Sequence, residues 1–432
     1  MRSPSTMTIF DPARGLFIAG RTAAIGARPA FLLIANTLFG NHPATLVAAA
    51  YLIVAGINNS TSAEVHRFYY ARFFGSALGP AANPFRRYVF ALAIFCAVGT
   101  VVCAVYFLKV ETSVMLTVVA VAFLLTEKMV DEGMRFLLFQ NRHRRWGLLA
   151  IVRVGAQFLA LVLLLVYLGF DPVSTYATGR SPALLAMAWP QAAAAILAAI
   201  VVGNAVIIPM IVPLAALRRL FRNKAMIGDG FGRGARQIVS NLKIWLLSLG
   251  LTVSLMLDRS IVMVADKSEL AVFSLIVASL SIIPTGIDLF FLSFRRREIL
   301  ESRMNLPRLF ASRPFWQVAV AGAVVGVGLA VVNIWLYDHG RAIPFEILAL
   351  VVVMQICLAA TAIAREVMLW NNLIDRSLRI EMIFVGGVGM LFAVMIPFNL
   401  DYRLFLAGAI LALMLRLCAF TMLSGDRLTI RA

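Results

Sequence analysis

The stretch IAGRTAAIGARPAFLLIANTLFG, residues 18–40, has the length and apolar content of a membrane-spanning helix, yet it carries two arginines. Arg21 and Arg28 are seven positions apart, so they differ by only about 20° around a helix axis and share one face. A charged side chain at the centre of a bilayer costs about 2.5–3.5 kcal/mol on insertion scales. Two such charges on one face therefore require a partner, a cavity or a route to the interface.

The composition of the whole chain is that of a polytopic membrane protein. Of its 432 residues, 61% are hydrophobic and only 14% are charged, and the mean hydropathy is +0.90. A soluble domain carries about 25% charged residues, so the net charge of +18 does not indicate a soluble nucleic-acid-binding protein. The four cysteines lie in apolar runs and predict no disulfide. The polar start leads into a full-length span, which predicts no cleavable signal.

Twelve apolar runs approach the roughly 20 residues that a membrane-spanning helix needs. Their approximate ranges are 16–39, 44–66, 87–108, 112–136, 146–169, 190–215, 237–257, 269–293, 315–337, 344–369, 380–398 and 402–423. The basic stretch 217–236 separates six spans from six. We therefore expect an N-terminal lobe (1–216), a cytoplasmic linker (217–236) and a C-terminal lobe (237–432), although the positive-inside rule explains the charge of this stretch equally well.

The loops alternate in charge along the chain. With the N-terminus in the cytoplasm, the cytoplasmic segments hold 28 lysines and arginines, whereas the opposite loops hold six. This asymmetry predicts that both termini are cytoplasmic. Much of the net positive charge is then a topology signal, and contact with anionic membrane lipids is expected on the cytoplasmic face.

Three stretches resemble the polysaccharide-biosynthesis flippases, which include the Wzx-type O-antigen flippases of the multidrug/oligosaccharidyl-lipid/polysaccharide (MOP) exporter superfamily. SLGLTVSLMLDRSIVMVADKSELAVFSLIVASLS, residues 248–281, is similar to the hairpin of the seventh and eighth helices, with Asp258 and Arg259 in its LDRSIV segment. INNSTSAEVHRFYYARFF, residues 57–74, resembles the exit of the second helix. MRFLLFQNRHRRWGLLAIVRVGAQFLALVLL, residues 134–164, resembles the connection between the fourth and fifth helices.

The resemblance covers most of the chain in topology and these patches in sequence. It implies a MATE-like fold, in which two six-helix bundles surround a central cavity, located in the bacterial inner membrane. It also implies alternating access acting on polyprenyl-pyrophosphate-linked glycans. A polysaccharide polymerase or co-polymerase is left open as a protein partner. No nucleic acid, cofactor, metal or catalytic residue is expected.

The candidate anion-binding residues are the basic side chains within predicted spans. Arg28 lies about 18 Å from the cytoplasmic start of its span, and Pro29 beside it favours a kink. Arg28 is expected to line a cavity or to pair with a buried carboxylate, whereas Arg21 either lines the cavity or reaches the interface. Lys243 and Arg153 lie about 10 Å inside the membrane, so each of them either lines the cavity or reaches the interface.

Further candidates are polar residues near the ends of the second and eighth spans. Asn58, Asn59, Ser62 and Glu64 follow too short an apolar run to lie outside the membrane, so we expect them to face protein or water. They either form helix-packing hydrogen bonds or make a polar cavity strip in which Glu64 takes part in ion coupling. Asp288 is the second candidate for coupling or ion pairing.

The acid in the eighth span has several possible partners. Asp288 could pair with Lys243, could titrate during transport, or could cap the arginines at 295–297. Pro284 and Gly286 in the same span are candidate hinge residues, as is Pro29. Arg416 is expected to be peripheral, because the resemblance places the twelfth helix at the edge of its bundle.

Three functions compete at this point. The first is a flippase for a polyprenyl-pyrophosphate-linked glycan, since arginine binds phosphate through paired hydrogen bonds. The second is a cation-coupled multidrug exporter of the same superfamily, which a basic cavity disfavours. The third is a polyprenyl-glycan polymerase or ligase, which is disfavoured because the extracytoplasmic loops are short and their acidic residues scattered.

Overall fold

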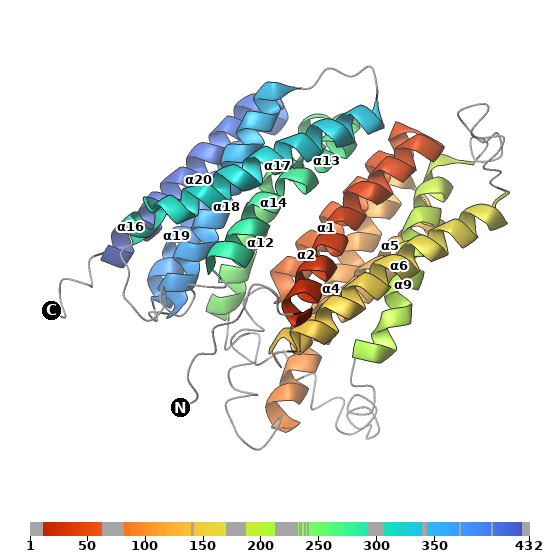
Figure 1. Ribbon diagram of the computed structural model, residues 1–432, viewed down its shortest axis with the longest axis horizontal. Helices are drawn as coiled ribbons and strands as arrows, with labels where there is room; N and C mark the ends of the chain where they lie inside the picture. The colour runs from red at the N-terminus through yellow and green to blue at the C-terminus, as the bar shows by residue number, and fades with distance from the viewer. Residues whose placement is uncertain are drawn as a thin grey trace. The chain divides into compact units, whose positions relative to one another are not determined.

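The structure is a computed structural model that describes residues 12–62, 82–139, 142–169, 187–211, 242–292, 306–338, 344–370, 373–398 and 401–425, with single positions at 232, 236 and 239. Every regular element in these ranges is helical (Figure 1). The elements are α1 (Pro12–Phe39), α2 (Asn41–Ser62), α4 (Ala82–Glu111), α5 (Val114–Phe139), α6 (His143–Tyr167), α9 (Trp189–Ile211), α12 (Leu242–Ala265), η1 (Lys267–Glu269), α13 (Leu270–Leu280), α14 (Ile282–Gly286), η2 (Ile287–Leu292), α16 (Leu306–Phe310), α17 (Arg313–Tyr337), α18 (Phe345–Trp370), α19 (Ile374–Phe398) and α20 (Tyr402–Gly425).

Within the described residues, eleven helices are long and apolar enough to cross a membrane. The predicted class, an all-α multi-pass membrane protein, is therefore confirmed. The helix that falls outside the eleven is α5, which is 26 residues long but carries five charged side chains. These are Glu127, Lys128, Asp131, Glu132 and Arg135. Each of the twelve predicted spans corresponds to a described helix or, for the eighth, to the series α13, α14 and η2.

The chain divides into two compact units, each described here by itself. The N-terminal unit holds residues 1–50 and 69–237, and the C-terminal unit holds residues 51–68 and 238–432. The division falls inside α2. The predicted linker, residues 217–236, lies outside the described residues except for positions 232 and 236.

The same packing plan occurs inside both units. In the N-terminal unit α1 packs on α6, and α9 packs on both α5 and α6. In the C-terminal unit α12 packs on α19, and α20 packs on both α18 and α19. By order in their six-helix halves, these pairs join the first helix to the fifth, and the sixth helix to the fourth and fifth. In each unit the first, fourth, fifth and sixth helices of the half therefore pack together.

Glycines allow the closest helix contacts in the N-terminal unit. A Cβ atom added to Gly20 of α1 would lie 2.5 Å from the carbonyl oxygen of Gly147 in α6. A Cβ added to Gly203 of α9 would lie 2.6 Å from the backbone nitrogen of Gln157 in α6. Neither position has room for a larger residue, so backbones of α1, α6 and α9 approach directly. This close packing brings polar side chains of different helices within bonding distance.

The eighth span is irregular where the sequence places Pro284 and Gly286. The α-helical pattern of α13 ends at Leu280, Ser281 forms a turn, and η2 is a π-helix that follows Gly286. Proline has no N–H group, so Pro284 cannot continue the α-helical hydrogen bonding to the carbonyl four residues earlier. By contrast, α1 continues as a helix through Pro29, which is buried.

Candidate functional site

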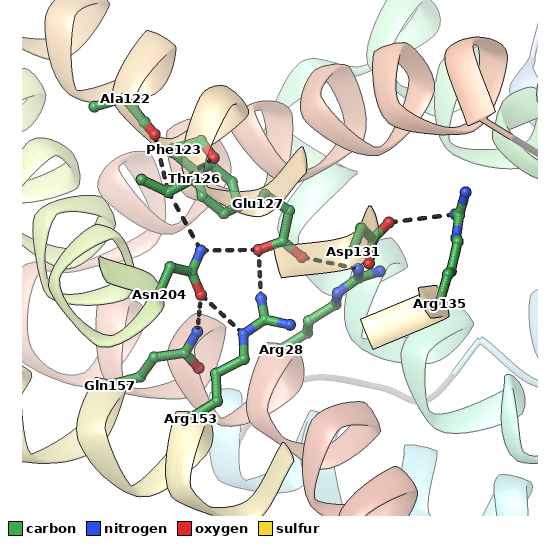
Figure 2. Close-up of polar contacts among 10 residues, drawn as sticks. All are labelled: Arg28, Ala122, Phe123, Thr126, Glu127, Asp131, Arg135, Arg153, Gln157 and Asn204. Atoms are coloured by element: carbon green, nitrogen blue, oxygen red, sulfur yellow. Dashed lines mark hydrogen bonds and ion pairs between the residues drawn. The ribbon is translucent and has the colours of Figure 1, made fainter. Parts of the chain in front are cut away.

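A buried polar cluster joins three helices of the N-terminal unit around Glu127 of α5 (Figure 2). Arg153 of α6 forms an ion pair with Glu127 Oε2 and donates from its Nε atom to Asn204 Oδ1 at 2.8 Å. Asn204 of α9 in turn donates from Nδ2 to Glu127 Oε2 at 3.0 Å. The carboxylate, the guanidinium and the amide thus form a closed set of contacts in the packed interior.

Neighbouring polar groups hold this cluster in place. Gln157 of α6 donates to Asn204 Oδ1 at 3.0 Å, and the Nδ2 atom of Asn204 lies 3.4 Å from the hydroxyl of Thr126. The Thr126 hydroxyl donates to the carbonyl of Ala122 at 2.8 Å. Asn204 is fully buried and uses both ends of its amide. Because the polar groups of this network are hydrogen-bonded to one another, the Glu127 carboxylate is kept in a fixed position.

Arg28 of α1 approaches the same carboxylate from the other side (Figure 2). Its Nη2 atom lies 4.0 Å from Glu127 Oε1, the upper limit of an ion pair, and 48% of its side chain is exposed. Arg28 faces a buried carboxylate, but it shares that carboxylate with Arg153 and keeps half of its surface open.

A second set of charges lies farther along α5. Lys128, which is almost fully buried, lies 3.2 Å from Glu132, and Arg135 lies 3.5 Å from Glu132 and 3.4 Å from Asp131. Lys128 lies inside the predicted span 112–136, and the structure places it within α5. Across both sets the four cations Arg28, Lys128, Arg135 and Arg153 face the three carboxylates Glu127, Asp131 and Glu132. These seven described side chains, of which Arg28 and Asp131 are partly exposed, thus carry a net positive charge.

The C-terminal unit contains a comparable cluster around Glu381 of α19. Arg416 of α20 donates to Glu381 and to the hydroxyl of Ser254 in α12. Arg365 of α18 lies 3.5 Å from Glu381 and donates to the carbonyl of Leu247. The side chains of Arg365, Glu381 and Arg416 are 2%, 0% and 1% exposed, so this cluster is sealed from solvent.

Arg416 is buried, although it lies on the helix that the resemblance places at the periphery. It is among the most buried charged groups, with its guanidinium carbon 4.5 Å from the ring centroid of Phe384. The expectation came from the resemblance, whereas the position of Arg416 follows from its contacts with α12 and α19. Arg365, which lies inside the predicted span 344–369, is likewise buried.

Lys243 lies at the exposed start of its helix. It is in the first turn of α12, before the candidate span that begins at Trp245, and 64% of its side chain is exposed. Its Nζ atom lies 2.6 Å from Asp375 Oδ1 in the first turn of α19. In the described part of the chain Lys243 therefore pairs with Asp375 and not with Asp288, which lies half-buried in the π-helix η2.

The remaining predicted residues lie on α1 and near the C-terminal end of α2. Arg21 is half-buried on α1, Asn58 of α2 is buried, and Asn59 is half-buried. Ser62 ends α2, but its side chain lies outside the described residues, as does all of Glu64. Within the residues that the structure describes, no group of histidine, cysteine, aspartate and glutamate side chains could hold a metal ion.

The chain has little sequence similarity to known proteins. No protein-family model matches the chain, and no curated protein matches it. A solved structure of a multidrug resistance MATE family transporter of the MOP superfamily, in an inward-facing conformation, is similar at 14% sequence identity with a TM-score of 0.48. The similarity covers 98% of this chain and 96% of that chain.

Proposed function

We propose that the protein is a membrane flippase that moves a polyprenyl-pyrophosphate-linked glycan from the cytoplasmic to the outer leaflet by alternating access. Its product would supply surface polysaccharide or O-antigen export in a bacterial plasma membrane. The observation that carries the proposal is Arg28, a half-exposed arginine inside a membrane-spanning helix, next to a carboxylate that Arg153 already neutralises.

The chemistry of this position suits a pyrophosphate. A guanidinium presents parallel N–H donors that match two phosphate oxygens, and it stays charged in every environment found in proteins. The fixed cluster of Glu127, Arg153 and Asn204 prevents Arg153 from leaving its carboxylate easily, whereas the contact of Arg28 with that carboxylate is long, at 4.0 Å. Arg28 is therefore the group in this cluster that an incoming anion can reach and bind.

The competing functions fit the described residues less well. A cation-coupled drug exporter would take cationic substrates. The net positive charge of the polar side chains on α1, α5 and α6 would repel them. A polymerase or ligase would need acidic or histidine side chains gathered outside the membrane. The carboxylates that the structure gathers within the N-terminal unit instead lie on α5, inside the helix packing and paired with basic groups.

The test is complementation of a strain that lacks the gene with Arg28→Gln or with the control Arg403→Gln. Arg403 is equally exposed, at 48%, and also pairs with a carboxylate, Glu346 at 2.9 Å. We expect Arg28→Gln to abolish export and to accumulate full-length lipid-linked glycan on the cytoplasmic leaflet, with Arg403→Gln close to wild type.

Normal export by Arg28→Gln at wild-type protein level would overturn the proposal. Accumulation of lipid-linked units on the outer leaflet in the deletion strain would indicate a polymerase instead. Unchanged glycan together with increased sensitivity to cationic drugs would indicate a drug exporter.

A further inference from the structure

The two oxygens of Glu127 are used differently. Oε2 accepts the contacts from Arg153 and from Asn204, which are the short ones. Oε1 faces Arg28 across 4.0 Å. The contact between Arg28 and Glu127 is thus the longest polar contact described in the cluster. Arg28 is the most exposed cation of the cluster, whereas the Glu127 carboxylate is held by Arg153 and Asn204.

The fixed position of Glu127 makes this contact separable. Arg153, Asn204 and, through Asn204, Gln157 anchor the carboxylate within α5, α6 and α9. Arg28 alone comes from α1 and has a long, flexible side chain. If an anion draws the guanidinium away, Glu127 keeps its other bonds and stays in place. When the anion leaves, the same carboxylate is there to receive Arg28 again.

We propose that Glu127 is an affinity-setting residue that competes with the anionic substrate for Arg28. This inference rests on the proposed function, because it takes the substrate of that site to be an anion. Binding of the anion displaces the contact between Arg28 and Glu127, so the attraction of Glu127 for Arg28 reduces the free energy that the anion gains. Glu127 thereby weakens binding and favours release, which a transporter needs at the end of each passage.

The other buried glutamates do not have this arrangement. Glu132, one turn farther along α5, lies 3.2 Å from the buried Lys128. Glu381 is enclosed with Arg365 and Arg416, whose side chains are 2% exposed or less. In the described chain, Glu127 is therefore the buried glutamate whose arginine partner is half-exposed and so accessible to a ligand. Glu132 supplies a matched control on the same helix.

The test is direct binding of inorganic pyrophosphate and of farnesyl pyrophosphate to the purified full-length protein in detergent. We expect Glu127→Gln to bind both about fivefold more tightly than wild type, the change expected for one partly exposed ion pair. Its export rate in cells should fall, because release slows. Glu132→Gln adds the same charge without touching Arg28, and it should leave the affinity unchanged. Arg28→Gln should remove binding in the wild-type and the Glu127→Gln backgrounds alike.

Equal or weaker binding by Glu127→Gln would overturn the inference, as would equal tightening by Glu132→Gln. If Glu127→Gln does not fold, Glu127→Asp replaces it, since the shorter side chain withdraws the carboxylate from Arg28 but keeps its charge. Folded Glu127→Asp with unchanged affinity would also overturn the inference. The binding assay needs no transport. Tighter binding by Glu127→Gln beside normal glycan export in the deletion strain would sustain the inference and refute the glycan substrate.

Discussion

The buried cluster of the C-terminal unit provides a sharp test of how charges are arranged in this protein. Glu381 is the carboxylate that both Arg365 and Arg416 contact, and all three side chains are sealed. Glu381→Gln would leave two buried guanidiniums facing a neutral amide. Breaking a buried ion pair in this way costs about 3–5 kcal/mol, so we expect the free energy of unfolding to fall by that amount.

Replacing one arginine should be milder than replacing the glutamate. Arg416→Met leaves Glu381 with Arg365 at 3.5 Å, a pair with no net charge. The loss is then the charged hydrogen bonds of Arg416, worth about 1.5–3 kcal/mol. The triple variant Arg365→Met, Glu381→Leu, Arg416→Met removes every charge at once. Apolar replacement of a complete buried ion cluster is often close to neutral, so we expect this variant to be nearly as stable as wild type.

The measurement is chemical unfolding in mixed micelles, with thermal melting followed by circular dichroism as a second readout. The predicted order of stability is wild type and the triple variant together, then Arg416→Met, then Glu381→Gln. If single effects were additive, the triple variant would be the least stable of all. A triple variant as unstable as Glu381→Gln would refute the reasoning, because it would mean that the cluster stabilises the unit by more than mutual charge compensation.

Two further predictions use the helix contacts and the exposed pair. Gly203→Ala should lower the stability by about 1–3 kcal/mol in the same unfolding assay, because the added Cβ would overlap the backbone of Gln157. Gly155→Ala on α6, where a Cβ meets nothing within 4 Å, should be neutral or slightly stabilising; equal losses in both variants would contradict the contact. Lys243→Ala should leave glycan export and melting temperature unchanged, since its pair with Asp375 is exposed on both sides and screened by water. Loss of export in a normally folded Lys243→Ala protein would show that Lys243 acts on the substrate.

The positions of the helices were predicted from the sequence more completely than the partners of the charged side chains. The spans were predicted from runs of apolar residues, and each has a helix in the structure, including α5, whose charges keep it out of the eleven apolar candidates. The alternative of a buried carboxylate for Arg28 was stated without naming Glu127. A signal for Glu127 was present, because it follows an uncharged, mostly apolar run of thirteen residues that starts at Val114.

The sequence by itself determined that this is a multi-pass helical membrane protein and that Arg21 and Arg28 share one helix face. Both follow from properties that add up along the chain, namely hydropathy and the angle between successive residues. Only the tertiary structure decided which charges meet. Glu127, Arg153 and Asn204 come from three helices, and Arg365, Glu381 and Arg416 from three others. An ion pair depends on a distance of a few ångströms between side chains, and packing of separate helices sets that distance.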